Sequence, residues 1–299
     1  SNCKDNAMSQ IIAVNDPSLV SSAGIVTYWS IHDSISYDAV CAQLKAAGLD
    51  DGALPGRMSA SKCLMLALEE AYVTARGATK VMALKGQSSK IGLYQHTGGT
   101  GESNYRCLWA VSADDKGTIT YHDMAATHDL IDEDMVSDGF AKVWGKLLPS
   151  DIGSWLAKLV RSPLINGLSL RDHGGIYFVP PSTRDMWNKV VAAIPNVKLF
   201  RIPAMNGPDA VAAVVSARGE EAQQLAHDLL EIKRKPQQED VKGKGGVRKS
   251  TIERMEKEAA NGIEKIKLYE QVLGQKLDAL RTQLTNASVE KTTADILSY

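Results

Sequence analysis

Five of the six histidines have an aspartate as an immediate neighbour. They form the pairs His32-Asp33, His122-Asp123, His128-Asp129, Asp172-His173 and His227-Asp228. Neighbouring imidazole and carboxylate groups hold the divalent ion of metal-dependent phosphohydrolases. Adjacent residues of a strand point to opposite faces, however, which separates two such ligands. We therefore expect capping and surface residues, with no metal and no catalytic residue, and a metal-dependent phosphohydrolase is the alternative function.

A glycine-rich stretch, His96–Glu102, lies between two expected strands. Such loops cradle phosphates when they open a helix, but this one opens a strand and lacks a Gly-Lys-Ser/Thr ending. We interpret it as a hairpin loop. The sequence has no nucleophile elbow, dinucleotide-binding fingerprint or kinase signature. It thus predicts a protein that is not an enzyme and needs no cofactor.

Charge is distributed unevenly, although the net charge is only -1. Residues 76–106 carry five basic and one acidic side chains, whereas residues 112–138 carry one basic and eight acidic side chains. Aromatic rings are interleaved with the basic stretch. Cations that hold phosphates beside rings that stack bases are typical of proteins that bind single strands of nucleic acid. A basic segment at residues 233–249 would add phosphate contacts.

This pattern predicts a single-stranded DNA-binding surface. Its expected residues are Lys80, Lys85, Lys90, Tyr94, Tyr105, Arg106, Trp109, Lys242, Lys244, Arg248 and Lys249. Strand alternation places Tyr105, Cys107, Trp109 and Val111 on one face. That face is either the binding surface or the core, so the role of Trp109 is open. In the alternative interpretation the lysines are ordinary solubility charges and the rings face the core.

Sequence periodicity predicts the elements that position these residues. After a strand that begins at Gly24 and two helices between Ser36 and Tyr72, the period changes from 3.6 to 2. The expected strands are 80–84, 90–94, 105–111 and 118–121, followed by helices at 132–148 and 151–161, a hairpin at 168–179, a helix at 183–194, a strand at 197–202 and a helix at 208–232. The fold class is α+β, with two mixed helix and antiparallel-hairpin lobes (about 24–124 and 125–232) forming one body.

The two ends of the chain differ from this body. Residues 1–23 are expected to be a flexible arm, and residues 233–249 a basic linker. From Ser250 to about Asn286 we expect one long helix. Its apolar residues recur at alternating steps of three and four from Ile252 to Leu273, which is typical of a coiled coil, and continue after one extra step of four. The sequence thus predicts a C-terminal helical extension, residues 250–299, which must pack on its own body or on a second copy. Of these two alternatives we predict self-association through residues 250–285. An assembly protein that acts through this helix is the second alternative function.

Composition indicates the class of protein. The hydrophobic fraction is 44% over 299 residues, which excludes an intrinsically disordered chain. No apolar run approaches the length of a membrane span, and the four cysteines are far apart. We expect a cytoplasmic protein with no membrane contact.

The segment Asp172–Pro181 is followed by a tryptophan-bearing helix, the basic linker and the C-terminal helix. In this plan, across residues 24–285, the chain resembles uncharacterised phage and mobile-element proteins. Among them it is similar to the single-stranded DNA-binding RNA polymerase cofactors of podoviruses that carry a virion RNA polymerase. The resemblance implies a non-enzymatic, oligomeric accessory protein of phage transcription or replication, a fold unlike OB-type binders, and a phage RNA polymerase as partner in the host cytoplasm. It transfers no residue role.

Overall fold

The computed structural model describes residues 24–74, 79–96, 105–123, 132–171, 174–204, 208–235, 247–274 and 276–290. Helices and antiparallel sheets occur together there, which confirms the α+β class. The chain forms two compact units. We call residues 30–156 with 189–198 the sheet unit, and the rest of the chain the helical unit. These units are discontinuous in sequence, unlike the expected lobes. None of the described helices combines the length and apolar character that a membrane span needs.

The sheet unit is built on an antiparallel meander, β3-β4-β5-β6. The Asp114 carboxylate stabilises the β5–β6 turn by accepting hydrogen bonds from the backbone N–H groups of Lys116 and Thr118. These bonds favour the ionised carboxylate and lower its pKa. The elements of this unit are β2 (Ile35–Ser36), α2 (Tyr37–Ala46), η1 (Asp51–Ala53), α3 (Ala60–Leu68), η2 (Glu69–Thr74), β3 (Thr79–Leu84), β4 (Gln87–His96), β5 (Tyr105–Ala113), β6 (Ile119–Asp123), α4 (Glu133–Val143), β7 (Lys146–Leu147) and most of α5 (Pro149–Arg161).

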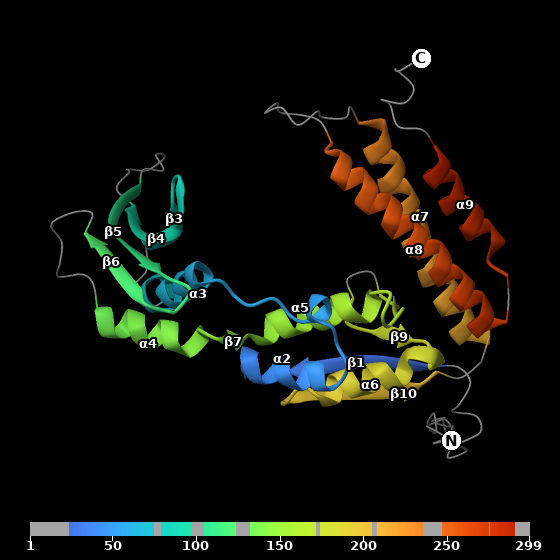
Figure 1. The fold of residues 1–299 in the computed structure, drawn as a ribbon, viewed down its shortest axis with the longest axis horizontal. Helices are drawn as coiled ribbons and strands as arrows, with labels where there is room; N and C mark the ends of the chain where they lie inside the picture. The colour runs from blue at the N-terminus through green and yellow to red at the C-terminus, as the bar shows by residue number, and fades with distance from the viewer. Residues whose placement is uncertain are drawn as a thin grey trace, which may run out of the picture. The chain divides into compact units, whose positions relative to one another are not determined.

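Helices α3 and α4 lie against one face of this meander (Figure 1). The Ser59 side chain accepts a hydrogen bond from the Lys62 N–H and caps α3, whose apolar residues then repeat at helical spacing. The helix buries Leu64 and Leu68 against the strands. The strands contribute the apolar residues Val81, Ile91, Leu93, Trp109 and Val111 to the same core.

The helical unit combines a second sheet with three long helices. Its sheet has the order β10-β1-β9-β8, in which β1 and β8 are antiparallel to β9. The buried Thr27 hydroxyl donates to the Phe200 carbonyl at 3.1 Å and accepts from Trp187 Nε1 at 3.5 Å. The unit is formed mainly by β1 (Ile25–Ile31), β8 (Leu168–Ser169), β9 (Tyr177–Val179), η4 (Pro181–Thr183), α6 (Arg184–Ala192), β10 (Val197–Pro203), α7 (Pro208–Arg234), α8 (Lys249–Leu273) and α9 (Asp278–Val289).

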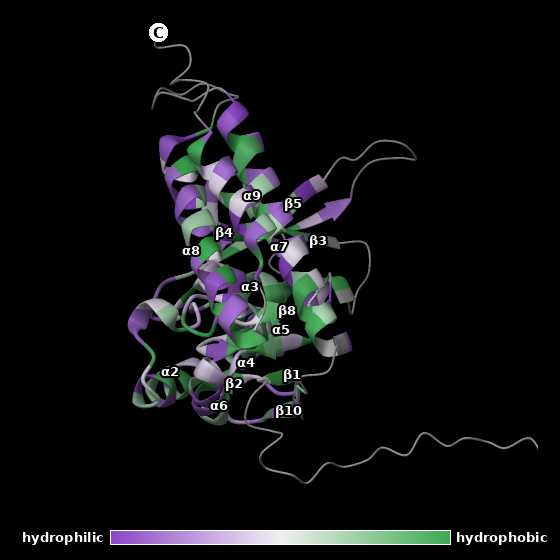
Figure 2. Ribbon diagram, turned by 90° about the vertical axis from the view of Figure 1, so that its right-hand side faces the viewer, coloured by the Kyte–Doolittle hydropathy of each residue, from purple (hydrophilic) through white to green (hydrophobic). Residues whose placement is uncertain are grey.

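The C-terminal helices correct two expectations. The long helix predicted from Ser250 to Asn286 ends at Gly274, whose φ of 65° is left-handed, and the chain continues as α9. The apolar seam of α8 packs against α7 and α9 of the same chain, and all three helices alternate polar and apolar faces (Figure 2). A Cβ at Gly262 would lie 3.1 Å from Leu225 and 3.2 Å from Leu284, so this glycine allows close helix packing. The apolar surface on which self-association through residues 250–285 was predicted is therefore buried within the chain itself.

The predicted linker is also shorter than expected at its start. Helix α7 continues to Arg234, and the Lys233 side chain is 2% exposed. Its Nζ donates to the carbonyl oxygens of Ser288 at 2.7 Å and Glu290 at 2.9 Å, and lies 3.1 Å from a Glu256 carboxylate oxygen. Lys233 thus binds the C-terminal end of α9 and is not part of a solvent-exposed linker.

Candidate nucleic-acid interface

A β-bulge decides which residues of β5 face solvent. Leu93 pairs with Trp109, but the next residue, Tyr94, pairs with Cys107, so Leu108 is an extra residue in β5. Alternation is therefore interrupted between Cys107 and Trp109. The two residues that precede the bulge, Tyr105 and Cys107, lie on the face opposite the helices.

We call that face of the meander the open face. Its residues are those that alternate with the core positions of each strand: Lys80, Met82, Lys90, Gly92, Tyr94, His96, Tyr105, Cys107, Ala110, Ser112, Thr120 and His122. Two of them are lysines and two are histidines, and none is acidic. The Asp114-Asp115 pair lies in the β5–β6 turn, nine residues along the chain from Tyr105. At about 3.3 Å per residue, the backbone between them spans at most about 30 Å, and the carboxylates lie at the opposite end of β5 from Tyr105.

Lys80, His96 and Tyr105 form a cation–aromatic cluster on the open face. The Tyr105 side chain is 41% exposed. Lys80 Nζ lies 5.4 Å from the centroid of its ring, and the His96 ring meets it edge-on at 5.3 Å. His96 and Tyr105 are paired across β4 and β5, so the backbone ladder holds the two rings together. The cluster offers a cation and an accessible ring surface at one end of the sheet.

Tyr94 extends this cluster along β4. It pairs with Lys80, and a Cβ at Gly92 would lie 2.8 Å from its ring and 3.0 Å from Cys107 Sγ. Glycine at position 92 thus leaves room for the ring next to the sheet. Burial, together with the neighbouring Cys107 thiol, raises the pKa of Tyr94, which keeps the phenol neutral. Tyr94 is half-buried, so its ring lies close to the sheet and does not project into solvent.

Trp109 does not belong to the open face. Its side chain is 1% exposed and lies in the core of the sheet unit, edge-on to Tyr72 at 5.3 Å between ring centroids. The proposed stacking role of Trp109 is therefore wrong, and the core alternative holds for Trp109 but not for Tyr105, which is exposed. The physical reason is the bulge at Leu108, because uninterrupted alternation would have kept Trp109 with Tyr105.

The remaining predicted DNA-binding residues are dispersed. Arg106 is exposed but pairs with Gln95, on the opposite face from Tyr105. Lys85 lies in the β3–β4 turn, while Lys90 lies on the open face opposite Ser112. Arg248 and Lys249 begin α8 in the helical unit. Lys242 and Lys244 lie outside the described residues, as do residues 97–102 of the glycine-rich stretch.

The described His-Asp pairs have local partners. His32 shares a hydrogen bond with Ser30 at 2.7 Å, and His122 shares one with Ser112 at 2.8 Å. The pairs at residues 128–129 and 172–173 lie outside the described residues.

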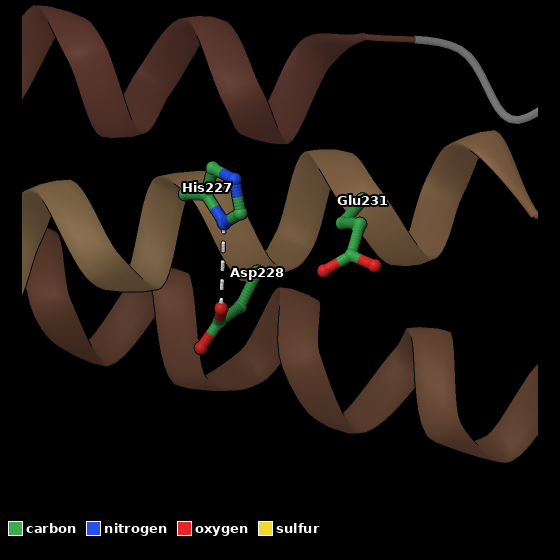
Figure 3. A group of neighbouring side chains, drawn as sticks. All are labelled: His227, Asp228 and Glu231. Atoms are coloured by element: carbon green, nitrogen blue, oxygen red, sulfur yellow. Dashed lines mark ion pairs between the residues drawn. The ribbon is translucent and has the colours of Figure 1, made fainter.

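Among the described residues, one group could supply three metal ligands: His227, Asp228 and Glu231 on the exposed surface of α7 (Figure 3). Gln224 donates to Asp228 at 2.7 Å, and Lys235 pairs with Glu231 at 2.8 Å and lowers its pKa. Each carboxylate already has a partner, Gln224 on α7 and Lys235 directly after it, and this geometry gives the phosphohydrolase alternative no support.

Residues 23–294 match the model of a family described as a family of unknown function, DUF6744. The chain belongs to this family. No curated protein and no solved structure matches the chain. The family description carries no activity, so the proposals below rest on the geometry of the chain alone.

Proposed function

We propose that this DUF6744 protein binds single-stranded DNA through the open face of its meander. The observation that carries the proposal is the cluster of Lys80, His96 and Tyr105 on a sheet face without carboxylates. A four-stranded sheet that is covered by helices on one side and carries aromatic residues on the other is a known platform for unpaired bases.

In the proposed binding mode, aromatic rings stack on bases and lysines contact phosphates. Bases of a single strand stack on the accessible surface of Tyr105, and Tyr94 supports the neighbouring position. Lys80 and Lys90 contact phosphates along the same face. Bases of a duplex are already stacked on each other and do not reach these rings, so the mode favours single strands. The chain acts as a binding protein in this proposal, and a phage RNA polymerase partner stays a prediction from the resemblance.

Binding of a fluorescent thymidine oligonucleotide, followed by anisotropy over a salt series, tests the proposal. Tyr105→Ala should weaken binding by about 1–3 kcal/mol with little change in salt dependence, whereas Tyr105→Phe keeps the ring and most of the affinity. Lys80→Ala should weaken binding and lower the salt slope by roughly 0.7 for the lost phosphate contact.

Lys116→Ala is the matched control, since this exposed lysine lies in the β5–β6 turn beside the carboxylates. Its affinity should equal that of the unmodified protein. Equal affinity for duplex and single strands, or equal effects of Lys80→Ala and Lys116→Ala, would show that the open face is not the binding surface.

A further inference from the structure

The helical unit contains a cleft of about 730 Å³. Helix α5 and the segment that follows it form one wall, and α7 and α8 form the other. This volume lies within the range of small-molecule sites, about 300–1,000 Å³. All of its lining residues belong to the helical unit. Five of them are cationic: Lys158, Arg161, Arg171, Arg218 and Lys265.

Three charged side chains form the floor of the cleft. Arg218 is 1% exposed and Lys265 is 7% exposed. The Arg218 guanidinium donates to the Glu221 carboxylate through Nη1 and to the Gly262 carbonyl through Nη2 at 2.6 Å. Lys265 Nζ lies 3.2 Å and 3.3 Å from the two Glu221 carboxylate oxygens. One carboxylate therefore serves two buried cations, which leaves one positive charge without a balancing anion.

The floor also holds an unused hydrogen-bond donor. Arg218 Nε is buried and has no hydrogen-bond partner among the described residues. Buried donors nearly always have a partner, and leaving one unpaired costs about 1–3 kcal/mol. An acceptor that arrives with a ligand would satisfy this donor and balance the excess charge together.

The rim of the cleft carries charges of both signs. Lys158, Arg161 and Arg171 are exposed and form no ion pair within the described part of the chain. Four acidic side chains also line the cleft, Glu220, Glu221, Asp228 and Glu258, and Glu258 pairs with Arg254, which is not a lining residue. The excess of positive charge is therefore located at the floor, where Arg218 and Lys265 share Glu221.

We propose that this cleft binds a small phosphorylated molecule, with its phosphate group near Arg218 and Lys265. Phosphate offers several acceptor oxygens and a negative charge, and arginine presents a planar array of donors that matches it. The apolar lining residues Pro163, Leu168 and Leu225 leave room for the rest of the molecule.

The state of Lys265 agrees with this assignment. Burial and the positive charges of Arg218 and Arg161 together lower its pKa to about 8, although the Glu221 carboxylate raises it. A phosphate dianion next to the ammonium group would favour the charged form. Binding should therefore be accompanied by proton uptake at pH values near 8.

Isothermal titration calorimetry of the full chain with inorganic phosphate and with glycerol phosphate tests the proposal. We expect saturable binding of one phosphate per chain, tighter for the ester, and proton uptake that is revealed by comparing buffers of different ionisation enthalpy. Lys265→Met should abolish the proton uptake, and Arg161→Ala should weaken binding about 10-fold or more through a lost charged contact. Arg161→Ala changes an exposed side chain, so it tests the site even if Lys265→Met does not fold.

Two controls separate this cleft from the open face. Lys257→Ala removes an exposed cation from the same helix, α8, outside the cleft, and should leave phosphate binding unchanged. Lys80→Ala should also leave it unchanged. Absence of saturable binding, or equal weakening by Arg161→Ala and Lys257→Ala, would overturn the proposal. Competition between phosphate and a single-stranded oligonucleotide for the cleft would overturn it as well, because the site would then serve nucleic acid.

Discussion

A single buried lysine nitrogen connects three segments of the helical unit. Lys233, on α7, contacts the last carbonyl groups of α9 and the Glu256 carboxylate of α8. Substitution by methionine keeps most of the volume but leaves these acceptors without a donor. We expect Lys233→Met to lower the free energy of unfolding by ~3 kcal/mol.

Urea denaturation measures this effect. Lys235→Met is the matched control, because Lys235 is an exposed lysine two residues away that forms a surface pair with Glu231. Its cost should stay within about 0.5 kcal/mol. Similar losses for both variants would mean that Lys233 contributes no more than a surface charge.

The pKa of Lys265 predicts a pH dependence of stability. Its folded-state pKa is about 8, below the ordinary value of 10.5. Between these values the unfolded chain binds more protons at this residue than the folded chain does, so the contribution of Lys265 to the free energy of unfolding rises with pH. Burial raises the pKa of Tyr269 above its ordinary value of 10.0. Above pH 10 the unfolded chain loses this proton first, so the contribution of Tyr269 to the free energy of unfolding falls there. The useful window is therefore pH 8 to 10.

In that window, the free energy of unfolding of the unmodified protein should increase relative to that of Lys265→Met. Chemical denaturation at intervals of half a pH unit, without phosphate in the buffer, provides the measurement. A constant difference between the two proteins across the window would contradict the assigned pKa.

At the scale of elements, the three C-terminal helices form a common core. Ile266 of α8 is fully buried in the cluster that α7 and α9 share. Ile266→Ala removes methyl groups from this core and should cost about 2–5 kcal/mol of stability. Val289→Ala, at a side chain that is 73% exposed, should be nearly neutral. Thermal unfolding followed by circular dichroism distinguishes the two, and equal melting temperatures would mean that α8 is not docked.

Local patterns predicted the elements better than they predicted the partners of those elements. The change of period from 3.6 to 2 identified the four strands of the meander correctly, because alternation depends on residues that are close in sequence. The seam of α8 was also identified, but its partner was not, since a period of three and four residues is the same for a coiled coil and for a helix docked on its own chain. The break at Gly274 was visible only as a shift in that period.

The candidate site depends on the β-bulge at Leu108, which the hydrophobic periodicity of one strand does not predict. A bulge adds a residue to one strand only, so it is defined by the register with the neighbouring strand. The inclusion of Tyr105 and Lys80 in one predicted surface needed only the pattern of charges and rings along the chain. The position of Trp109 needed the pairing of β5 with β4. The cleft around Arg218 needed still more, because its residues come from four segments spread over residues 158–265.

For the whole molecule, the internal location of the α8 seam predicts the mass in solution. We expect light scattering after size-exclusion chromatography to give a mass near 32.3 kDa for the full chain, independent of concentration in the micromolar range. The surface that the coiled-coil pattern offered for a second copy is already occupied by α7 and α9. A stable dimer would require another interface and would revive the assembly function.

Leu108 shifts the alternation of β5 by one residue, because it has no partner in β4. Upstream of it the odd-numbered residues face solvent, and downstream of it the odd-numbered residues face the core. Deletion of Leu108 would restore regular alternation and leave Tyr105 and Cys107 on the open face, whereas a regular strand that kept Leu108 would place Trp109 on the same face as Tyr105. The identity of the exposed surface thus depends on whether this strand accommodates its extra residue as a bulge, as much as on the types of its residues.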